Sequence, residues 1–287
     1  MITVILKERF GNILFQYAVG RHLAIKNNTT LRLNVIHYMK KHDPFAKKII
    51  RPLQDFGFTE ILYRPPIYKR ILWGYGLYLP AADQRFYHEK GWGFDPKVLK
   101  IKDGVYLDGF FQSEKYFKNI ESTIRKDLRL IEPSFNHEAL IYKEKIINSN
   151  SVGIHIRRGD YLHSQVHNIC DLNYYAKAIQ YIQERLAHPR FFVFSDDIAW
   201  CLKNMKLDNG DFISLPDSKG HFISDFWLLS LCKHTIIPNS TFSWWAAWLN
   251  ANPDKIVVVP HRWFNDKAFN IRAIEDTIPP EWIRIAW

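Results

Sequence analysis

Short apolar runs alternate with amphipathic segments along most of the chain, and the alternation is clearest after residue 150. Apolar runs of about four to eight residues between polar or glycine residues predict buried strands, whereas apolar positions at three- and four-residue spacing predict helices. In the N-terminal part this pattern predicts strands at 2–6, 30–34 and 105–109 and helices at 12–26, 112–128 and 136–148. Residues 35–100 show no clean period, so no element is predicted there.

The C-terminal part is more regular. The predicted strands are 151–156, 191–194, 211–215, 235–238 and 255–259, and the predicted helices are 173–186, 196–201, 223–233 and 241–249. Asn173 is the expected N-cap of the first of these helices, and Ser195 or Asp196 that of the second. Strands that alternate with helices at such short intervals predict a doubly wound parallel sheet.

A polar stretch, Asn148-Ser149-Asn150-Ser151, separates the two parts of the chain. We therefore predict an α/β fold with two Rossmann-like domains, residues 1–148 and 149–287, that face each other across a cleft.

Composition and charge limit the classes of ligand that the protein is expected to bind. Aromatic residues make up 15% of the chain, with 10 Trp, 14 Tyr and 20 Phe. Flat rings suit either a large core or the C–H faces of sugars. The formal net charge of +10 attracts anions. Because no block of basic residues stands out, we interpret the charge as diffuse, which favours an anionic lipid or a nucleotide and not a nucleic acid.

Three widely spaced cysteines without a C-x-x-C pair argue against a disulfide framework and against a zinc cluster. No stretch approaches the roughly 20 apolar residues of a membrane helix, and the N-terminus lacks a signal-peptide core. We therefore expect a cytoplasmic protein, and peripheral contact with the inner face of the cell membrane stays open.

The segment His155-Ile156-Arg157-Arg158-Gly159-Asp160-Tyr161 directly follows an apolar strand. Ligands of open α/β sheets bind beyond the carboxyl ends of strands, so a site is expected there. Two guanidinium groups suit phosphate oxygens. A structural Arg–Asp pair is the alternative interpretation of the same residues.

Two further strand-to-helix junctions carry polar residues. In Asn239-Ser240-Thr241-Phe242-Ser243, side chains and free backbone N–H groups favour an anion, although simple N-capping would use one of them. In Ser195-Asp196-Asp197, carboxylates could accept hydrogen bonds from a ribose or a base. No D-x-D occurs in the sequence, so we predict no metal site and expect cationic side chains to stabilise a leaving diphosphate.

Together these segments resemble the bacterial α-1,2-fucosyltransferase family, glycosyltransferase family 11. The resemblance runs in order over nearly the whole chain. The matching segments are Phe10 to Ala18, Gly109 to Phe117, His155 to Tyr161, Tyr174-Tyr175 with Ala178-Ile179, Phe194 to Asp197, and Asp225 to Trp248.

The resemblance implies a GT-B-like fold and a galactoside 2-α-L-fucosyltransferase-like hexosyltransferase. It implies GDP-β-L-fucose as the donor, inversion, no metal or other cofactor, and transfer to the 2-hydroxyl of a galactose-containing glycan in surface polysaccharide or O-antigen synthesis. The expected catalytic residues are Arg157, Asp160 and His155. The expected donor-binding residues are Arg158, Asp196, Ser240, Thr241 and Ser243, and the expected acceptor or loop residues are Asn12 and Gln16.

One segment departs from the family pattern. Where the family usually has a Gly-Gly-x-Gly-Asn turn, this chain has Glu8-Arg9-Phe10-Gly11-Asn12. Either Arg9 replaces a backbone contact to the ligand, or this loop faces the acceptor sugar. Two alternatives to fucosyl transfer also stay open: use of another nucleotide sugar, and a non-catalytic glycan-binding module.

Overall fold

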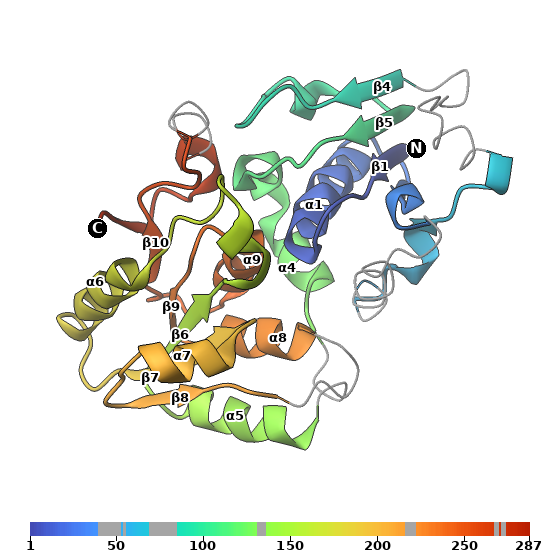
Figure 1. Cartoon of the computed structure of the whole chain (residues 1–287). Coiled ribbons are helices and arrows are strands. Elements are labelled where there is room, and N and C mark those ends of the chain that lie inside the picture. Colours follow the sequence, from blue (N-terminus) through green and yellow to red (C-terminus); the bar gives the residue numbers. More distant parts are fainter. Residues whose placement is uncertain are drawn as a thin grey trace. The chain divides into compact units, whose positions relative to one another are not determined.

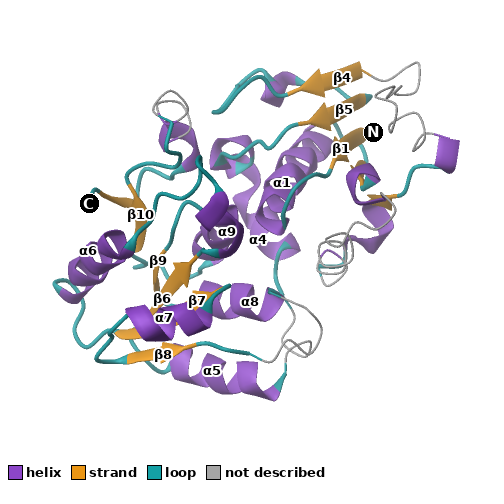
Figure 2. Cartoon of the chain, in the orientation of Figure 1, coloured by secondary structure: helices purple, strands orange, loops and turns teal. Residues whose placement is uncertain are grey.

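The computed structural model describes residues 1–39, 53, 56–68, 85–130, 136–215, 222–266, 270 and 274–287. The chain divides into two compact units, Met1–Leu130 and Ile131–Trp287, each with its own parallel sheet (Figures 1 and 2). The predicted α/β class is thereby confirmed. The helix expected at 136–148, before the predicted domain boundary, lies in the second unit.

The first sheet has the strand order β3–β2–β1–β5–β4, and every neighbouring pair is parallel. Its strands are β1 (Ile2–Ile5), β2 (Leu31–Asn34), β3 (Leu62–Tyr63), β4 (Arg85–His88) and β5 (Val105–Asp108). From β1 the chain moves outward to β2 and β3, whereas β5 lies on the other side of β1. The first sheet therefore has a topological switch point between β1 and β5, the place where open α/β sheets bind ligands.

The helix α1 (Phe10–Lys26) connects β1 to β2 and packs closely on the sheet. A Cβ atom at Gly20 would lie 2.4 Å from Cγ2 of Val4 and 2.8 Å from Cδ1 of Leu31. Val4 and Leu31 are buried residues of β1 and β2. The missing side chain at Gly20 is thus what allows this close approach.

The helix predicted over 112–128 is wrong in its first half. Residues there form two 3₁₀ turns, and only α4 (Glu121–Asp127) is α-helical. Phe117 lies between the turns with φ −139°, outside the helical region, and it is fully buried together with its neighbour Tyr116. A continuous α-helix would turn these adjacent side chains about 100° apart, so burying both favours the break. Further 3₁₀ turns in the described part of the first unit are Ile36–Met39, Phe58–Ile61 and Val98–Lys100.

The second sheet has the order β11–β10–β9–β6–β7–β8, again with every pair parallel. Its strands are β6 (Ser151–Ile156), β7 (Arg190–Ser195), β8 (Gly210–Phe212), β9 (His234–Ile236), β10 (Val257–Pro260) and β11 (Ile283–Ile285). The helices of this unit that the structure delimits are α5 (His137–Ile147), α6 (Leu172–Gln183), α7 (Ile198–Asn204), α8 (Ile223–Leu231) and α9 (Thr241–Leu249). The switch point of this sheet lies between β6 and β9.

Side chains that alternate along β6 meet helices on both faces of the second sheet. Val152, Ile154 and Ile156 share one apolar core with buried residues of α6 and α7. His155 points to the other face, where its ring lies 5.2 Å from that of Phe242 on α9. This two-sided cover is the doubly wound arrangement that the sequence predicts, and it explains why β6 is buried at every position. Of the helices in the described part of the chain, none has the length and apolar character needed to cross a bilayer.

Two of the predicted N-caps are wrong. Asp171 caps α6 by accepting from the Tyr174 N–H, so this helix begins before Asn173. Asp197, and not Ser195 or Asp196, caps α7 by accepting from the Trp200 N–H. The cap lies later because β7 continues through Ser195.

The strands β3, β4 and β11 were not predicted. They are edge strands of their sheets. Each is half-buried or exposed along its length, so none shows the apolar run of an interior strand.

The loop after β1 adopts a backbone conformation that favours glycine. Glu8 has φ +66°, in the left-handed region, and it is exposed. Its carbonyl accepts a hydrogen bond from the Tyr38 hydroxyl at 2.5 Å. Glu8 occupies the position of the first glycine in the family pattern. The backbone there keeps a positive φ, which is strained for a residue with a Cβ atom.

We therefore predict that Glu8→Gly raises the free energy of unfolding by about 0.5–1 kcal/mol, because glycine adopts positive φ without a Cβ clash. Glu8→Ala is the matched control. It removes the same carboxylate but keeps the Cβ atom, so no gain is expected. Urea unfolding of the three proteins measures the difference, and an equal gain in both variants would show that charge and not backbone strain is responsible.

Candidate active site

The three junctions singled out in the sequence follow three neighbouring strands. β6 pairs with β7 on one side and with β9 on the other, and all three run parallel. Their carboxyl ends therefore meet at one edge of the second sheet, at its switch point. The segments after these strands carry the arginines, the Asp196-Asp197 pair and the start of α9.

Arg157 lies between two carboxylates. Its Nη2 contacts Oδ1 of Asp160, three residues along the chain, and its Nη1 lies 2.8 Å from Oδ2 of Asp196 after β7. The guanidinium carbon is 5.7 Å from the ring centre of Tyr161. Arg157 is only partly exposed, so these partners hold its guanidinium in one direction.

Arg158 is fixed by a different set of partners. Its backbone N–H donates to Oδ1 of Asp196 at 2.8 Å, and its Nε donates to Oδ2 of Asp197 at 3.1 Å. The guanidinium stacks on Trp200, with its carbon 3.5 Å from the ring centre. A guanidinium stacked on an indole face gains cation–π attraction. Sequence reasoning missed Trp200, because its contact with Arg158 joins segments that follow two different strands.

Gly159 leaves room for the carboxylate that both arginines use. A Cβ atom at this position would lie 2.7 Å from Oδ2 of Asp196. Any other residue would thus push the Asp196 carboxylate or the arginine loop away.

His155 is buried, with 6% of its surface exposed, and its ring packs against Phe242. Its Nδ1 has no hydrogen-bond partner among the described residues. Burial, assisted by the positive charge of Arg157, lowers the pKa of His155 to about 3. The imidazole is therefore neutral at neutral pH and adds no charge to the site.

The three predicted residues at the start of α9 differ in their surroundings. Ser240 is the N-cap residue, but its side chain makes no capping hydrogen bond. Thr241 opens the helix and is partly exposed. Ser243 is fully buried and its hydroxyl donates to the Ser240 carbonyl at 3.2 Å. Ser240 therefore does not act as a simple side-chain cap of α9. The N–H groups of the first turn lie at the positive end of the helix dipole, which favours an anion.

Tyr161 and Asn239 connect the arginine loop to the start of α9. The Tyr161 hydroxyl donates to the Asn239 carbonyl at 3.1 Å. The Asn239 amide is buried and donates to the carbonyls of His167, at 3.1 Å, and Trp263, at 2.8 Å. The two junctions are therefore held together by hydrogen bonds within the second unit.

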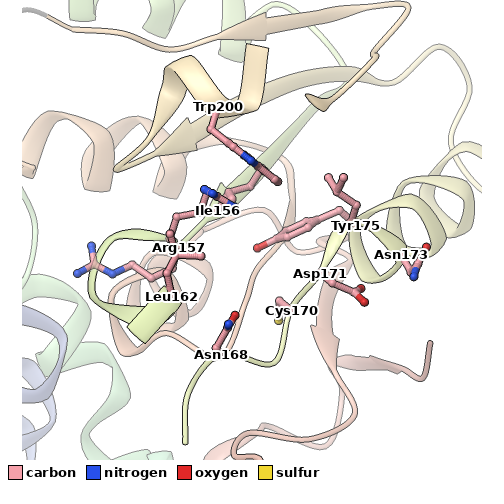
Figure 3. A pocket seen from close by; sticks show the side chains of 11 residues that line it. Ile156, Arg157, Leu162, Asn168, Cys170, Asp171, Asn173, Tyr175 and Trp200 are labelled. Carbon is pink, nitrogen blue, oxygen red and sulfur yellow. The ribbon is translucent and has the colours of Figure 1, made fainter. Parts of the chain in front are cut away.

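A pocket of about 480 Å³ opens beside the arginines. It is lined by Ile156, Arg157, Arg158, Leu162, Asn168, Cys170, Asp171, Leu172, Asn173, Tyr175 and Trp200 (Figure 3). In Figure 3 the Arg157 side chain extends away from Trp200 and Tyr175, whereas the Arg158 guanidinium stacks on Trp200. The volume is within the range of small-molecule sites.

The site is not simply positive. The two arginines face the carboxylates of Asp160, Asp196 and Asp197, and His155 is neutral. An anionic ligand must therefore compete with carboxylates for the guanidinium groups. Within the described residues, no group of three or more His, Cys, Asp or Glu side chains is arranged to hold a metal ion.

The two predicted residues of the N-terminal part lie in the first unit. Gln16 is fully buried, and its amide bonds to the backbone of Lys7 and to the Gly109 carbonyl at 3.1 Å. It thereby ties the segment after β1 to the segment after β5. Asn12 accepts a hydrogen bond from the Gln112 side chain at 2.8 Å.

The fold is that of GT-B-type glycosyltransferases. The structure resembles NodZ alpha-1,6-fucosyltransferase soaked with GDP-fucose, with a TM-score of 0.52 and 15% identity over 86% of this chain and 92% of that one. It also resembles fucosyltransferase NodZ from Bradyrhizobium, with a TM-score of 0.51 and 15% identity over 85% and 91%. At this identity the likeness concerns the fold alone.

The family model for glycosyl transferase family 11 matches residues 1–286, so the chain belongs to that family. Over 286 residues it is 32% identical to an alpha-1,2-colitosyltransferase of Escherichia coli, covering 96% of this chain and 95% of that protein. Over 296 residues it is 27% identical to galactoside 2-alpha-L-fucosyltransferase Sec1 of Mus musculus, covering 100% and 74%. A third relative, the O-antigen biosynthesis glycosyltransferase WbnK of Escherichia coli, is 37% identical over 174 residues, 58% of this chain and 57% of that protein. The chain is thus a glycosyltransferase of the fucosyltransferase type.

The lowered pKa of His155 predicts a pH-dependent stability. Below an unfolded-state pKa of about 6.5 the unfolded chain binds a proton at His155, whereas the folded chain does not bind it until the pH nears 3. The free energy of unfolding therefore decreases as the pH falls through this range. Between pH 7.5 and pH 4.5 the wild type should therefore lose up to about 3 kcal/mol more unfolding free energy than His155→Gln, which lacks this titrating group. Urea unfolding at both pH values measures it. A pH-independent difference would contradict a neutral, buried imidazole.

Proposed function

We propose that the chain transfers L-fucose from GDP-β-L-fucose to the 2-hydroxyl of a galactoside, with inversion and without a metal ion. The observation that carries the proposal is the pair of fixed guanidinium groups at the carboxyl end of β6, beside the start of α9. Membership of family 11 and the names of the relatives support the donor class.

In this proposal the diphosphate occupies the space that Arg157, Arg158 and the first turn of α9 share. Guanidinium groups and helix N–H groups stabilise the negative charge that develops on the leaving diphosphate. Asp196 holds both arginines in place, and Asp160 orients Arg157. Neutral His155 lies beneath this loop and serves as a hydrogen-bonding group without charge.

The nucleoside part of the donor is assigned to the pocket lined by Tyr175 and Trp200. A pocket of about 480 Å³ can enclose a group of that size. The aromatic wall offers apolar surface, while Asp171 and Asn168 offer hydrogen-bonding groups. Because the cationic side chains already supply the charge that a metal ion would bring, the proposed transfer is a single displacement that does not require one.

A second candidate function is transfer of colitose. It is favoured by the relative that matches almost the full length of this chain, an alpha-1,2-colitosyltransferase. Fucose and colitose differ by the hydroxyl at carbon 3, so one donor hydrogen bond is enough to separate the two activities.

The biological setting is part of the proposal. A relative named for O-antigen biosynthesis supports a role in surface polysaccharide synthesis. Such a role would place the enzyme in the cytoplasm, at or near the inner face of the cell membrane, where a net charge of +10 favours anionic lipid.

A panel of donors and acceptors tests the function. We expect the protein to transfer from GDP-fucose to β-galactosides, with EDTA leaving the rate unchanged, and to use GDP-mannose and UDP-galactose at least about 100-fold less well. Mass spectrometry of the products, followed by linkage analysis, provides the readout. Preferred use of GDP-colitose would select the second candidate, and no transfer from any GDP-deoxysugar would contradict both.

The same assay should include Arg157→Ala. Removing this guanidinium should lower kcat about 100-fold or more, because it is assigned to charge that grows in the transition state. Arg185→Ala is the matched control, since Arg185 is an exposed, ion-paired arginine in the same unit away from the site. Near-normal turnover of the Arg157 variant would contradict the assignment of the site.

A further inference from the structure

The loop after β10 carries an arginine that the proposed donor site does not use. Arg262 lies two residues beyond the end of β10 and is partly exposed. In the strand order β10–β9–β6, β9 lies between the other two, and all three strands are parallel (Figure 1). The segments after β6 and β10 therefore flank the segment after β9, which leads into α9. Arg262 thus belongs to the same carboxyl edge of the second sheet as Arg157 and Arg158.

Asn239, just before α9, connects the two flanking segments. Its carbonyl accepts from the Tyr161 hydroxyl at 3.1 Å, on the β6 side. Its side-chain amide donates to the carbonyl of Trp263, the neighbour of Arg262, at 2.8 Å, on the β10 side. The backbone next to Arg262 is therefore held beside the start of α9.

A second set of hydrogen bonds joins the Arg262 loop to the wall of the pocket. The backbone N–H of Asn265 donates to the Val166 carbonyl at 2.9 Å, and its side-chain amide donates to the Asn168 carbonyl at 3.3 Å. Asn168 and Cys170 line the pocket. Burial raises the pKa of the Cys170 thiol to about 12, and the charge of Arg262 opposes this rise. Arg262 therefore lies near the part of the wall that Asn168 and Cys170 form.

The guanidinium of Arg262 is held in place but is not neutralised. Its carbon lies 5.2 Å from the ring centre of Trp287, whose ring centre is 5.0 Å from that of Tyr174 on α6. Among the described residues, no carboxylate forms an ion pair with Arg262, and its buried Nε has no hydrogen-bond partner. A buried N–H group without a partner costs free energy, so this guanidinium is not satisfied by the protein alone. Because the residue is partly exposed, a ligand can reach the side chain.

The arginines after β6 are in the opposite situation. These two guanidinium groups face three carboxylates, those of Asp160, Asp196 and Asp197. Asp171 adds a further carboxylate to the wall of the pocket, and His155 is neutral. This group of side chains therefore has no surplus of positive charge. A diphosphate needs a cation whose charge is not already offset, and Arg262 is one.

We infer that Arg262 is a third guanidinium of the donor site and binds the diphosphate from the β10 side of α9, with Arg157 on the β6 side. This inference rests on the proposed use of a nucleotide diphosphate sugar. Arg157 and Arg158 are fixed in direction by their carboxylate partners, whereas Arg262 supplies the positive charge that attracts the diphosphate. Its planar fork of N–H donors matches two phosphate oxygens. Trp287 supports Arg262 as Trp200 supports Arg158.

Arg262→Gln tests the assignment, because Gln keeps a hydrogen-bonding group but carries no charge. We expect the Kd for GDP, measured by calorimetry, to rise at least about tenfold, while the Kd for guanosine changes by less than about twofold. Arg262→Lys keeps the charge without the planar fork, so its affinity for GDP should lie between those of the Gln variant and the wild type. Arg284→Ala removes an exposed arginine from β11 of the same unit and is the matched control, with wild-type affinity for GDP.

Packing on Trp287 gives Arg262 a structural alternative, so the melting temperature of each variant is measured as well. Arg262→Met keeps an unbranched stem on the indole without the charge, and it should show the same loss of GDP affinity if the Gln variant is unstable. A Kd for GDP within about threefold of wild type in the folded variants would overturn the inference. So would an equal loss for GDP and guanosine, because that result would reflect the shape of the pocket and not the phosphates.

The wild type separates this inference from the proposed function. A wild-type protein that binds no GDP would overturn both. A wild-type protein that binds GDP and shows the expected loss at Arg262, yet transfers no fucose, would support the third guanidinium and overturn the proposed transfer alone.

Discussion

The candidate donor site depends on one carboxylate, that of Asp196. It accepts the backbone N–H of Arg158 and pairs with the guanidinium of Arg157, both at 2.8 Å, and thereby joins the loops that follow β6 and β7. Parallel neighbouring strands bring the two loops within reach, and Gly159 leaves space for the carboxylate. Asp196 thus holds the Arg157 guanidinium and the backbone of Arg158, while Asp197 and Trp200 direct the Arg158 guanidinium. Charge fixed in this way is pre-organised before a ligand arrives.

The same solution occurs in the first unit. There Asp108 links the segments after β1, β4 and β5 by pairing with Lys7 and His88. In both units a partly buried carboxylate at the carboxyl edge of a parallel sheet holds basic residues that follow or end a neighbouring strand. The two carboxylates differ in their partners. Asp108 pairs with a lysine and a histidine, whereas Asp196 holds guanidinium and backbone groups that, with a helix start, suit phosphate.

Much of the second unit could be predicted from the sequence because its signals are local. Fully buried strands such as β6 appear as apolar runs, and the polar residues that follow them mark the carboxyl edge of the sheet. The position of α9 was predicted to the residue. The caps of α6 and α7 were missed by one or two positions. For α7 the reason is that β7 continues through Ser195, and where a strand ends depends on its pairing and not only on its own residues.

The contact between His88 and Asp108 in the first unit could not be predicted in the same way. β4 has the sequence Arg-Phe-Tyr-His and is mostly exposed, so it is a strand only because it pairs with β5. The contact between His88 and Asp108 joins residues 20 positions apart across that pairing. Trp200 was likewise invisible as a site residue, because its stacking on Arg158 needs the loops after β6 and β7 to be side by side.

The most direct test of the account is the affinity for GDP of the Asp196→Asn variant, measured by calorimetry beside the wild type. Asn is isosteric with Asp but removes a negative charge from an anion site. If Asp196 positions the two arginines, GDP binding becomes weaker, by tenfold or more, despite the more favourable charge. If GDP binds as tightly or more tightly, Asp196 only neutralises the arginines, and the pre-organised donor site described here is contradicted.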